Sequence, residues 1–274
     1  MILQSDLLPV TLKHAFTTRR LVVSPPKTAS QGTEGANFRV DSINDTCKWW
    51  VKLRDRIFTP KHTCYLHEQV HGGRVRVVDP DEANGDVSEV DGFRYRVLGE
   101  GDAIIRPFGR KPVFLAITTA DCLPCVVYDP NSGAVGVVHA GWRGLAADIP
   151  ANTMRMFKSE LGVQPKDLLW AIGPSIDVNN YEVGNEVIAA LEIAGYAESD
   201  WRDDPDCVPG WVRGRRRDHY QVNLAALAAM RLRSLGVPSS QIDICALSTF
   251  ENPNLFYSYR RDGEIRGLQA TVIG

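Results

Sequence analysis

The alternation of apolar and polar residues along the chain predicts a sheet-rich middle third. Short apolar or alternating runs, separated by turn signals such as Asp129-Pro130-Asn131, are typical of strands. These runs predict strands at residues 74–78, 113–118, 124–128 and 134–138, with two more near the end of the chain at 242–247 and 255–259.

Longer segments with apolar residues at helical spacing predict helices, most of them in the second half of the chain. They lie at about residues 42–58, 145–161, 185–194 and 223–235. Gly162, Gly195 and Gly236 follow the last three segments, and glycine often ends a helix. Strands and helices mixed in this way, without an internal repeat, predict one mixed α/β domain over residues 1–274.

Composition narrows the class of protein without identifying its chemistry. The 274 residues are 44% hydrophobic, which is enough for a large core, and the formal net charge is −2. This balance gives no sign of a nucleic-acid partner, and the apolar runs are too short to cross a bilayer. The first residues lack the basic and apolar regions of a secretory signal, so we expect a cytoplasmic protein.

The cysteines do not predict a disulfide framework. They are scattered through a chain that is large enough to build a core without covalent links, so we expect reduced thiols. The six are Cys47, Cys64, Cys122, Cys125, Cys207 and Cys245.

Three short segments carry residues that bind metals, namely residues 69–72 (Gln-Val-His-Gly), 118–122 (Thr-Thr-Ala-Asp-Cys) and 139–144 (His-Ala-Gly-Trp-Arg-Gly). The thiolate of Cys122 and the imidazoles of His71 and His139 form a good zinc set. Three protein ligands leave the fourth position for water or substrate, as in catalytic zinc sites. Asp121 is a carboxylate that could orient one of these ligands.

The glycines after His139 predict a sharp turn into a helix. Gly141 and Gly144 allow the backbone to turn closely, and the N–H groups at the start of the next helix can receive an anion. Arg143 would add positive charge at this point.

Two familiar motifs lack the context that they need. Residues 67–71 read His-Glu-Gln-Val-His, but the glycines that follow and the alternating run at 74–78 predict a strand, whereas a zinc protease needs a helix. Cys122 and Cys125 have thioredoxin-like spacing, but a strand follows them. We therefore interpret Cys125 as a core residue.

Further recognisable segments span nearly the whole chain, namely residues 16–19 (Phe-Thr-Thr-Arg), 173–174 (Gly-Pro), 181–184 (Tyr-Glu-Val-Gly) and 256–263 (Phe-Tyr-Ser-Tyr-Arg-Arg-Asp-Gly). With the three metal-capable segments, they resemble the laccase-domain family, which was named multicopper polyphenol oxidase and later reassigned as purine nucleoside phosphorylase. The resemblance implies a four-layer α/β/β/α sandwich with zinc held by the residues that here are His71, Cys122 and His139.

The resemblance also implies the chemistry of the protein. The family's activities are phosphorolysis of adenosine, inosine, guanosine and methylthioadenosine, and hydrolytic deamination of adenosine. The alternative is a hydrolase that edits a peptidoglycan precursor by removing a wrong amino acid from a nucleotide-linked molecule. The size of the pocket bounded by residues 24–37, which contain a Gly/Ser/Thr-rich stretch, would separate these functions.

The chain departs from the family pattern at two places. Val22 and Val23 stand where the family usually has two glycines, and Val90-Asp91-Gly92 stands where it usually has Ala-Asp-Ala. Asp91 keeps the carboxylate and is a weak site candidate.

Three other interpretations are disfavoured. A true laccase needs more copper-binding imidazoles than the six histidines of this chain provide. The arginine-rich residues 213–217 are interpreted as a solvated loop rather than a nucleic-acid site. A closed, structural zinc site would need a fourth ligand, and Cys245 is the far-downstream thiol that could supply it.

The two expected reactions need different groups. For deamination, zinc would lower the pKa of a bound water toward about 7 and present hydroxide to C6 of adenine. Its acid-base partner is not identified by the sequence. For phosphorolysis the protein must fix phosphate beside the ribose, and Arg19 and Arg143, with Arg260 behind them, are the candidates. The partners are therefore a purine nucleoside and phosphate, and the oligomeric state is left open.

Overall fold

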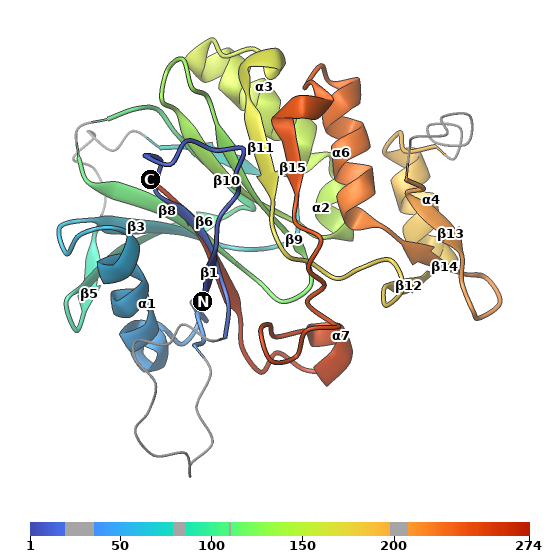
Figure 1. Cartoon of the computed structure of the whole chain (residues 1–274), viewed down its shortest axis with the longest axis horizontal. Coiled ribbons are helices and arrows are strands. Elements are labelled where there is room, and N and C mark those ends of the chain that lie inside the picture. The colour runs from blue at the N-terminus through green and yellow to red at the C-terminus, as the bar shows by residue number, and fades with distance from the viewer. Residues whose placement is uncertain (20–35, 79–85, 110, 198–207) are drawn as a thin grey trace.

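Two β-sheets that pack face to face form the centre of the molecule (Figure 1). The computed structural model describes residues 1–19, 36–78, 86–109, 111–197 and 208–274. The larger sheet has the strand order β1-β2-β16-β8-β3-β6-β5. Its strands are β1 (Ile2–Leu3), β2 (His14–Thr17), β16 (Gln269–Ile273), β8 (Val113–Thr119), β3 (Thr63–Glu68), β6 (Phe93–Glu100) and β5 (Ser88–Val90).

The second sheet has the order β15-β11-β9-β10-β7-β4. Its strands are β15 (Ile242–Ile244), β11 (Leu169–Ile172), β9 (Leu123–Tyr128), β10 (Val135–Ala140), β7 (Ala103–Arg106) and β4 (Val75–Val77). A small third sheet joins β12 (Glu182–Gly184), β14 (His219–Val222) and β13 (Trp211–Arg213). Because β3 precedes β4, β6 precedes β7 and β8 precedes β9, the chain passes three times from the larger sheet to the second sheet.

The apolar runs of the central strands are buried on both faces. In β8, Phe114 and Ala116 pack on the side of α1 (Ile43–Ile57), whereas Leu115 and Ile117 belong to the core between the two sheets. The alternation follows from the period of two along a strand. This burial explains why the runs read as continuously hydrophobic.

Helices cover the outer faces of both sheets and complete four layers. Figure 1 shows α1 against the larger sheet, with α2, α3 and α6 on the far side of the second sheet. The fold is therefore the expected α/β/β/α sandwich. The helices after α1 are α2 (Trp142–Ala146), α3 (Ile149–Leu161), α4 (Asn185–Ile193), α6 (Leu224–Ser234) and α7 (Tyr259–Asp262), with short 3₁₀ turns at Pro165–Asp167 and Ser239–Gln241.

Most predicted elements are confirmed, and one helix is divided. The segment predicted as a helix over residues 145–161 contains the end of α2 and all of α3. Between them Asp148 adopts a left-handed backbone with φ 53°, and Pro150 stands in the first turn of α3. Arg231 binds the carboxylate of Asp148 and helps to hold this break.

The strand predicted at residues 255–259 is wrong. The Ser258 hydroxyl accepts a hydrogen bond from the backbone N–H of Arg261 at 3.2 Å and so caps the short helix α7. The apolar side chains of Phe256 and Tyr257 are buried in a loop rather than in a strand. A short run of aromatic residues has the same sequence pattern in a buried loop as in a strand, so the sequence alone could not distinguish the loop from a strand.

Several sequence predictions fall on residues outside the described ranges. These are Val22 and Val23, nearly all of the pocket-bounding segment 24–37, and Cys207. The other five cysteines are free thiols, as expected. No helix in the described part of the chain is long and apolar enough to cross a membrane.

Candidate metal centre

The three predicted ligands meet at one end of the second sheet, two of them on connections between the sheets and one in a strand. His71 lies between β3 and β4, and Cys122 lies in the turn between β8 and β9. His139 is the penultimate residue of β10, which pairs with β9 directly beside Cys122. Two of the three passages between the sheets, β3 to β4 and β8 to β9, therefore bring His71 and Cys122 to the end of the strand that carries His139.

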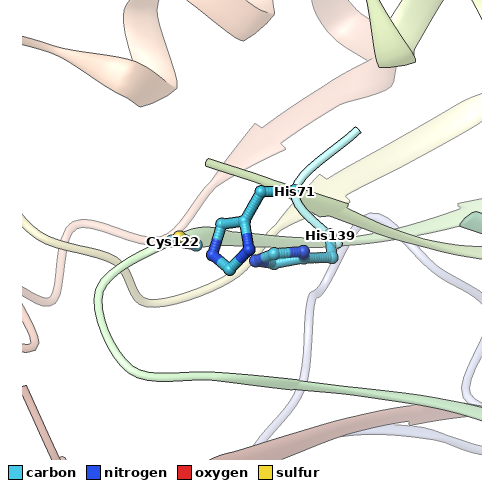
Figure 2. Close-up of side chains that lie close together, drawn as sticks. All are labelled: His71, Cys122 and His139. Atoms are coloured by element: carbon cyan, nitrogen blue, oxygen red, sulfur yellow. The ribbon is translucent and has the colours of Figure 1, made fainter. Parts of the chain in front are cut away.

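The ligand atoms of His71, Cys122 and His139 all lie within 4.8 Å of one another. Figure 2 shows the two imidazoles and the thiol converging, and the imidazole centroids are 4.7 Å apart with the rings nearly perpendicular. His139 is buried, Cys122 is half-buried and His71 is exposed. The donor set fits zinc, and its exposed side leaves room for a further ligand or a substrate.

The electrostatics of the cluster favour a thiolate at Cys122. Burial alone would raise its pKa, but the charges and hydrogen bonds of His139 and His71 lower it to about 6. Burial lowers the pKa of His139, yet the nearby Cys122 and Asp102 raise it to about 9. A thiolate is the form of cysteine that binds metals, and the proton that stabilises it on His139 would leave when a cation binds.

Gly141 is required by the close approach of the ligands. A Cβ atom on this residue would lie 2.8 Å from Cys122 Sγ and 3.3 Å from His71 Cδ2. Its φ of −77° suits any residue, so the requirement comes from space and not from backbone strain. The glycine predicted for a turn thus also makes room for the thiol of Cys122 and the ring of His71.

The helix after Gly141 is shorter than predicted. This helix, α2, has only five residues and ends before Asp148, whose backbone is left-handed. Few peptide dipoles therefore sum to a positive end at its N-terminus. Arg143 lies in its first turn, and its guanidinium stacks 4.3 Å from the ring centroid of Trp142.

Asp102, which the sequence analysis missed, joins the two histidines. It is fully buried. One carboxylate oxygen accepts hydrogen bonds from His139 Nδ1 at 2.8 Å and from the His71 backbone N–H at 2.9 Å. The other oxygen accepts from the Gly72 N–H at 2.7 Å. The only sequence signal was a charged residue next to the apolar run of β7.

Asp121 lies beside Cys122, but its carboxylate binds three residues between positions 249 and 260. It accepts hydrogen bonds from Thr249 Oγ1 at 2.6 Å, from Ser258 Oγ at 3.0 Å and from the Arg260 backbone N–H at 2.7 Å. The predicted ligand-orienting carboxylate therefore holds residues 249–260 beside the cluster.

The three candidate arginines differ in how they are held. The guanidinium of Arg19 donates to the Pro253 carbonyl at 2.9 Å and lies 4.4 Å from the Tyr257 ring centroid. Arg143 is exposed and, among the described residues, has no ion-pair partner. The guanidinium of Arg260 lies 4.9 Å from the Tyr181 ring centroid and donates to the Glu182 carbonyl at 2.8 Å.

Tyr181 marks the region where the metal cluster and two of these arginines meet. Burial raises the pKa of its hydroxyl, the anionic groups of Cys122 and Asp121 raise it further, and Arg260 and Arg143 lower it. All four groups are therefore close enough to act on the phenol. In the sequence, Tyr181 stands out only as part of the segment 181–184, which does not by itself assign it to the site.

The motif-based alternatives have structural explanations. His67 lies in β3, buried, with its ring nitrogens 2.9 Å from the Gly99 carbonyl and 3.1 Å from the Ala103 carbonyl, so residues 67–71 do not form the helix of a zinc protease. Cys125 is buried in β9, and burial raises its pKa to about 12.

The weaker candidates lie outside the cluster. Asp91 accepts a hydrogen bond from Cys47 Sγ at 3.3 Å, beneath α1. In the described part of the chain, the one metal-capable group contains His71, Cys122 and His139, and Cys245 does not join it. The arginine-rich residues 213–217 form an exposed connection between β13 and β14, where Arg216 pairs with Glu182.

The chain is similar in sequence and in fold to known proteins. A purine nucleoside phosphorylase of Bacteroides thetaiotaomicron is 34% identical over 171 residues, which are 62% of this chain and 59% of that protein. A purine nucleoside phosphorylase of Deinococcus radiodurans is 35% identical over 270 residues, covering 97% of this chain and 90% of that protein. The crystal structure of Bacillus licheniformis hypothetical protein YfiH superposes with a TM-score of 0.79 at 28% identity, covering 96% and 92% of the two chains.

Residues 13–274 match the family described as multi-copper polyphenol oxidoreductase laccase. The match includes all three metal-capable residues and each of the three candidate arginines. The chain therefore belongs to the multi-copper polyphenol oxidoreductase laccase family.

Proposed function

We propose that this protein is a zinc-dependent purine nucleoside phosphorylase, with adenosine deamination as a second activity of the same centre. The observation that carries the proposal is the convergence of His71, Cys122 and His139 within 4.8 Å, open to solvent on the His71 side. Relatives named purine nucleoside phosphorylase at 34% and 35% identity support the choice of substrate class.

His71, Cys122 and His139 would hold the zinc. The bound ion would supply a Lewis acid that activates water at neutral pH, which is the chemistry that deamination needs. Asp102 fixes the ring of His139, and Gly141 leaves space for the thiolate and the His71 ring.

Phosphorolysis depends on fixing an anion beside the nucleoside. Arg143 has an exposed guanidinium that no described residue neutralises, so it is the best phosphate-binding candidate. Arg260 is held against Tyr181 by stacking and by its bond to the Glu182 carbonyl, which would preorganise it for the same anion. Arg19 is a weaker candidate for binding phosphate, because its guanidinium already donates to the Pro253 carbonyl and stacks on Tyr257.

The test is chromatography of adenosine incubated with zinc-loaded protein, with and without phosphate. Phosphate-dependent adenine is the expected product of phosphorolysis, and inosine is the expected product of deamination. The variant Cys122→Ala should lose bound zinc and both products together. Turnover by zinc-free protein would overturn the zinc mechanism. Untouched adenosine would instead favour the hydrolase that edits a nucleotide-linked peptidoglycan precursor.

Polyphenol oxidation is disfavoured despite the family's description. The chain has six histidines, and the metal-capable group in its described part contains two of them and one thiol. A trinuclear copper cluster with a separate blue-copper site needs more imidazoles. Oxidation of a phenolic substrate by copper-loaded protein, at a rate above that of adenosine turnover, would contradict the proposal.

A further inference from the structure

Asp102 occupies a position from which one side chain can reach both histidine ligands. It immediately precedes β7, the strand between β4 and β10 in the second sheet. The chain enters β4 soon after His71, and His139 lies in β10. A side chain at the start of the middle strand therefore lies between the two neighbours that carry the ligands.

The contact with His139 selects the ring atom that can bind the metal. His139 Nδ1 lies 2.8 Å from the Asp102 carboxylate, and the His139 backbone N–H donates to the Asp102 carbonyl at 2.7 Å. A carboxylate only accepts hydrogen bonds, so Nδ1 must carry the proton. In the neutral ring that binds a metal, Nε2 then carries no proton and is the nitrogen available to the cation.

The contact with His71 holds a backbone that is unfavourable on its own. His71 adopts a left-handed conformation with φ 60°, which L-residues other than glycine seldom adopt. The successive N–H groups of His71 and Gly72 both donate to the Asp102 carboxylate, at 2.9 and 2.7 Å. The Asp102 backbone N–H also donates to the Arg74 carbonyl at 3.0 Å, so the loop is fixed on both sides of the ligand.

We infer that Asp102 is the positioning residue of the metal centre, which sets His139 Nε2 as the ligand atom and holds the loop that presents His71. The inference rests on the zinc centre of the proposed function and is independent of the reaction. Since the carboxylate of Asp121 binds residues 249, 258 and 260, Asp102 has this role rather than the acidic neighbour of Cys122.

The variant Asp102→Asn tests the role, because it keeps the size of the side chain and replaces one acceptor by a donor. At least one of the three N–H groups would then face an amide N–H, or His139 would change its tautomer. We expect zinc affinity, measured by competition with a chromogenic chelator, to fall about 10–100-fold. The thiolate-to-metal absorption of the cobalt-loaded variant should change, because one imidazole no longer binds in the same geometry.

Asp129 provides a matched control within the chain. It is as buried as Asp102, and its carboxylate also accepts two backbone N–H bonds and one side-chain bond, from Asn131 and Ser132, with no metal-capable partner. Asp129→Asn should keep wild-type zinc affinity and the wild-type cobalt spectrum. Equal zinc affinity and equal cobalt spectra in wild-type protein and Asp102→Asn would overturn the inference.

A measurement on the wild-type protein covers the case in which Asp102→Asn does not fold. In zinc-loaded protein with ¹⁵N-labelled histidine, NMR should show a protonated Nδ1 and a metal-bound Nε2 for His139. Zinc bound to His139 Nδ1 would overturn the role of Asp102 and leave the metal centre itself intact. Wild-type protein that binds no zinc at micromolar concentration would overturn the metal centre itself, and adenosine turnover does not enter either outcome.

Discussion

Asp102 and Asp121 are both buried carboxylates that accept three hydrogen bonds, yet they hold different regions together. Asp102 binds the two histidine-bearing segments. Together with Cys122 and Gly141 they form what we call the ligand region (residues 69–74, 102, 122 and 139–141). Asp121 binds what we call the terminal region (residues 249–260), which carries Arg260. We therefore propose that the two carboxylates have separate roles, which we call the division of labour. Asp102 positions the metal-capable side chains, and Asp121 positions the segment that would contact substrate.

The variant Gly141→Ala should break the ligand region with the largest effect. The new Cβ would meet Cys122 Sγ at 2.8 Å and His71 Cδ2 at 3.3 Å, so two ligands must move while the backbone stays unstrained. We expect zinc affinity to fall about 100-fold, at the upper end of the range for changes to residues that support metal ligands. Chelator competition measures this loss, and both nucleoside activities should fall with it.

Gly144→Ala is the control from the same segment. A Cβ there would lie 3.5 Å from the Gly72 carbonyl oxygen and 3.6 Å from that of His139, which are ordinary contacts. Gly144 lies inside α2, where alanine is a better helix former. Zinc affinity should stay at the wild-type value. A loss as large as that of Gly141→Ala would mean that packing against the helix, and not space around the ligands, explains the effect.

Asp121→Asn should break the terminal region instead. Asparagine has one acceptor oxygen and no charge, so even if that oxygen keeps both Ser258 and the Arg260 N–H, these bonds lose their charge assistance. A lost charge-assisted hydrogen bond costs about 1.5–3 kcal/mol, or roughly 10–100-fold in an equilibrium. We expect the phosphate KM to rise about 10-fold, the lower end of that range, and zinc affinity to change little.

The backbone should tolerate this change, because Asp121 has φ 97° and asparagine accepts positive φ better than most residues. Zinc titration and phosphate kinetics on the same preparation separate the two regions. If zinc affinity falls and the phosphate KM does not rise, Asp121 belongs to the ligand region and the proposed division of labour is wrong.

Arg143→Ala should sharpen the comparison, since Arg143 lies in sequence beside the ligand region but is proposed to bind substrate. Loss of one guanidinium contact to phosphate should raise the phosphate KM about 10-fold, with a smaller change in the adenosine KM. Arg155, exposed on α3 and bonded to Asn152, is the matched surface control. An unchanged phosphate dependence in Arg143→Ala would remove this residue from the phosphate site.

The ligand region was only partly predictable from the sequence. His71, Cys122 and His139 each lie in a short segment with other polar residues, and their side chains are themselves metal-binding types, so the local sequence was sufficient to find them. Asp102 forms its bonds with residues 31 and 37 positions away, and nothing within its own segment records those partners. Only the strand order β10-β7-β4 brings the three together, and sequence periodicity does not determine strand order.

The terminal region illustrates a different failure. The apolar residues 255–257 predicted a strand, but their backbone is fixed by contacts with distant polar groups, including Gln269, which accepts from the Tyr257 N–H at 2.9 Å. The long apolar strands were predicted well because burial on both faces leaves a continuous signal. Loops held by buried polar side chains leave no periodic signal at all.

The smallest expected effect lies outside both regions, at His14 in β2. Its ring is buried, the Leu12 carbonyl accepts from Nδ1 at 3.0 Å, and Nε2 accepts from the Ser5 N–H at 3.0 Å. The neutral ring satisfies both partners, whereas a protonated Nε2 would face another N–H group. Burial lowers the pKa of His14 in the folded protein below its usual 6.5.

Since the folded state resists this proton and the unfolded state does not, the stabilisation by His14 is complete above pH 6.5 and is lost as the pH falls below it. The loss is at most about 1.4 kcal/mol per pH unit. Urea unfolding between pH 7.5 and 5 should show a shallower decline for His14→Gln than for the wild type, although the variant starts from lower stability. The same dependence in both proteins would assign the acid loss to other groups. Zinc affinities of Gly141→Ala and Asp121→Asn should therefore be compared above pH 6.5, where protonation of His14 does not destabilise the fold. Differences in affinity then report on the ligand region and the terminal region.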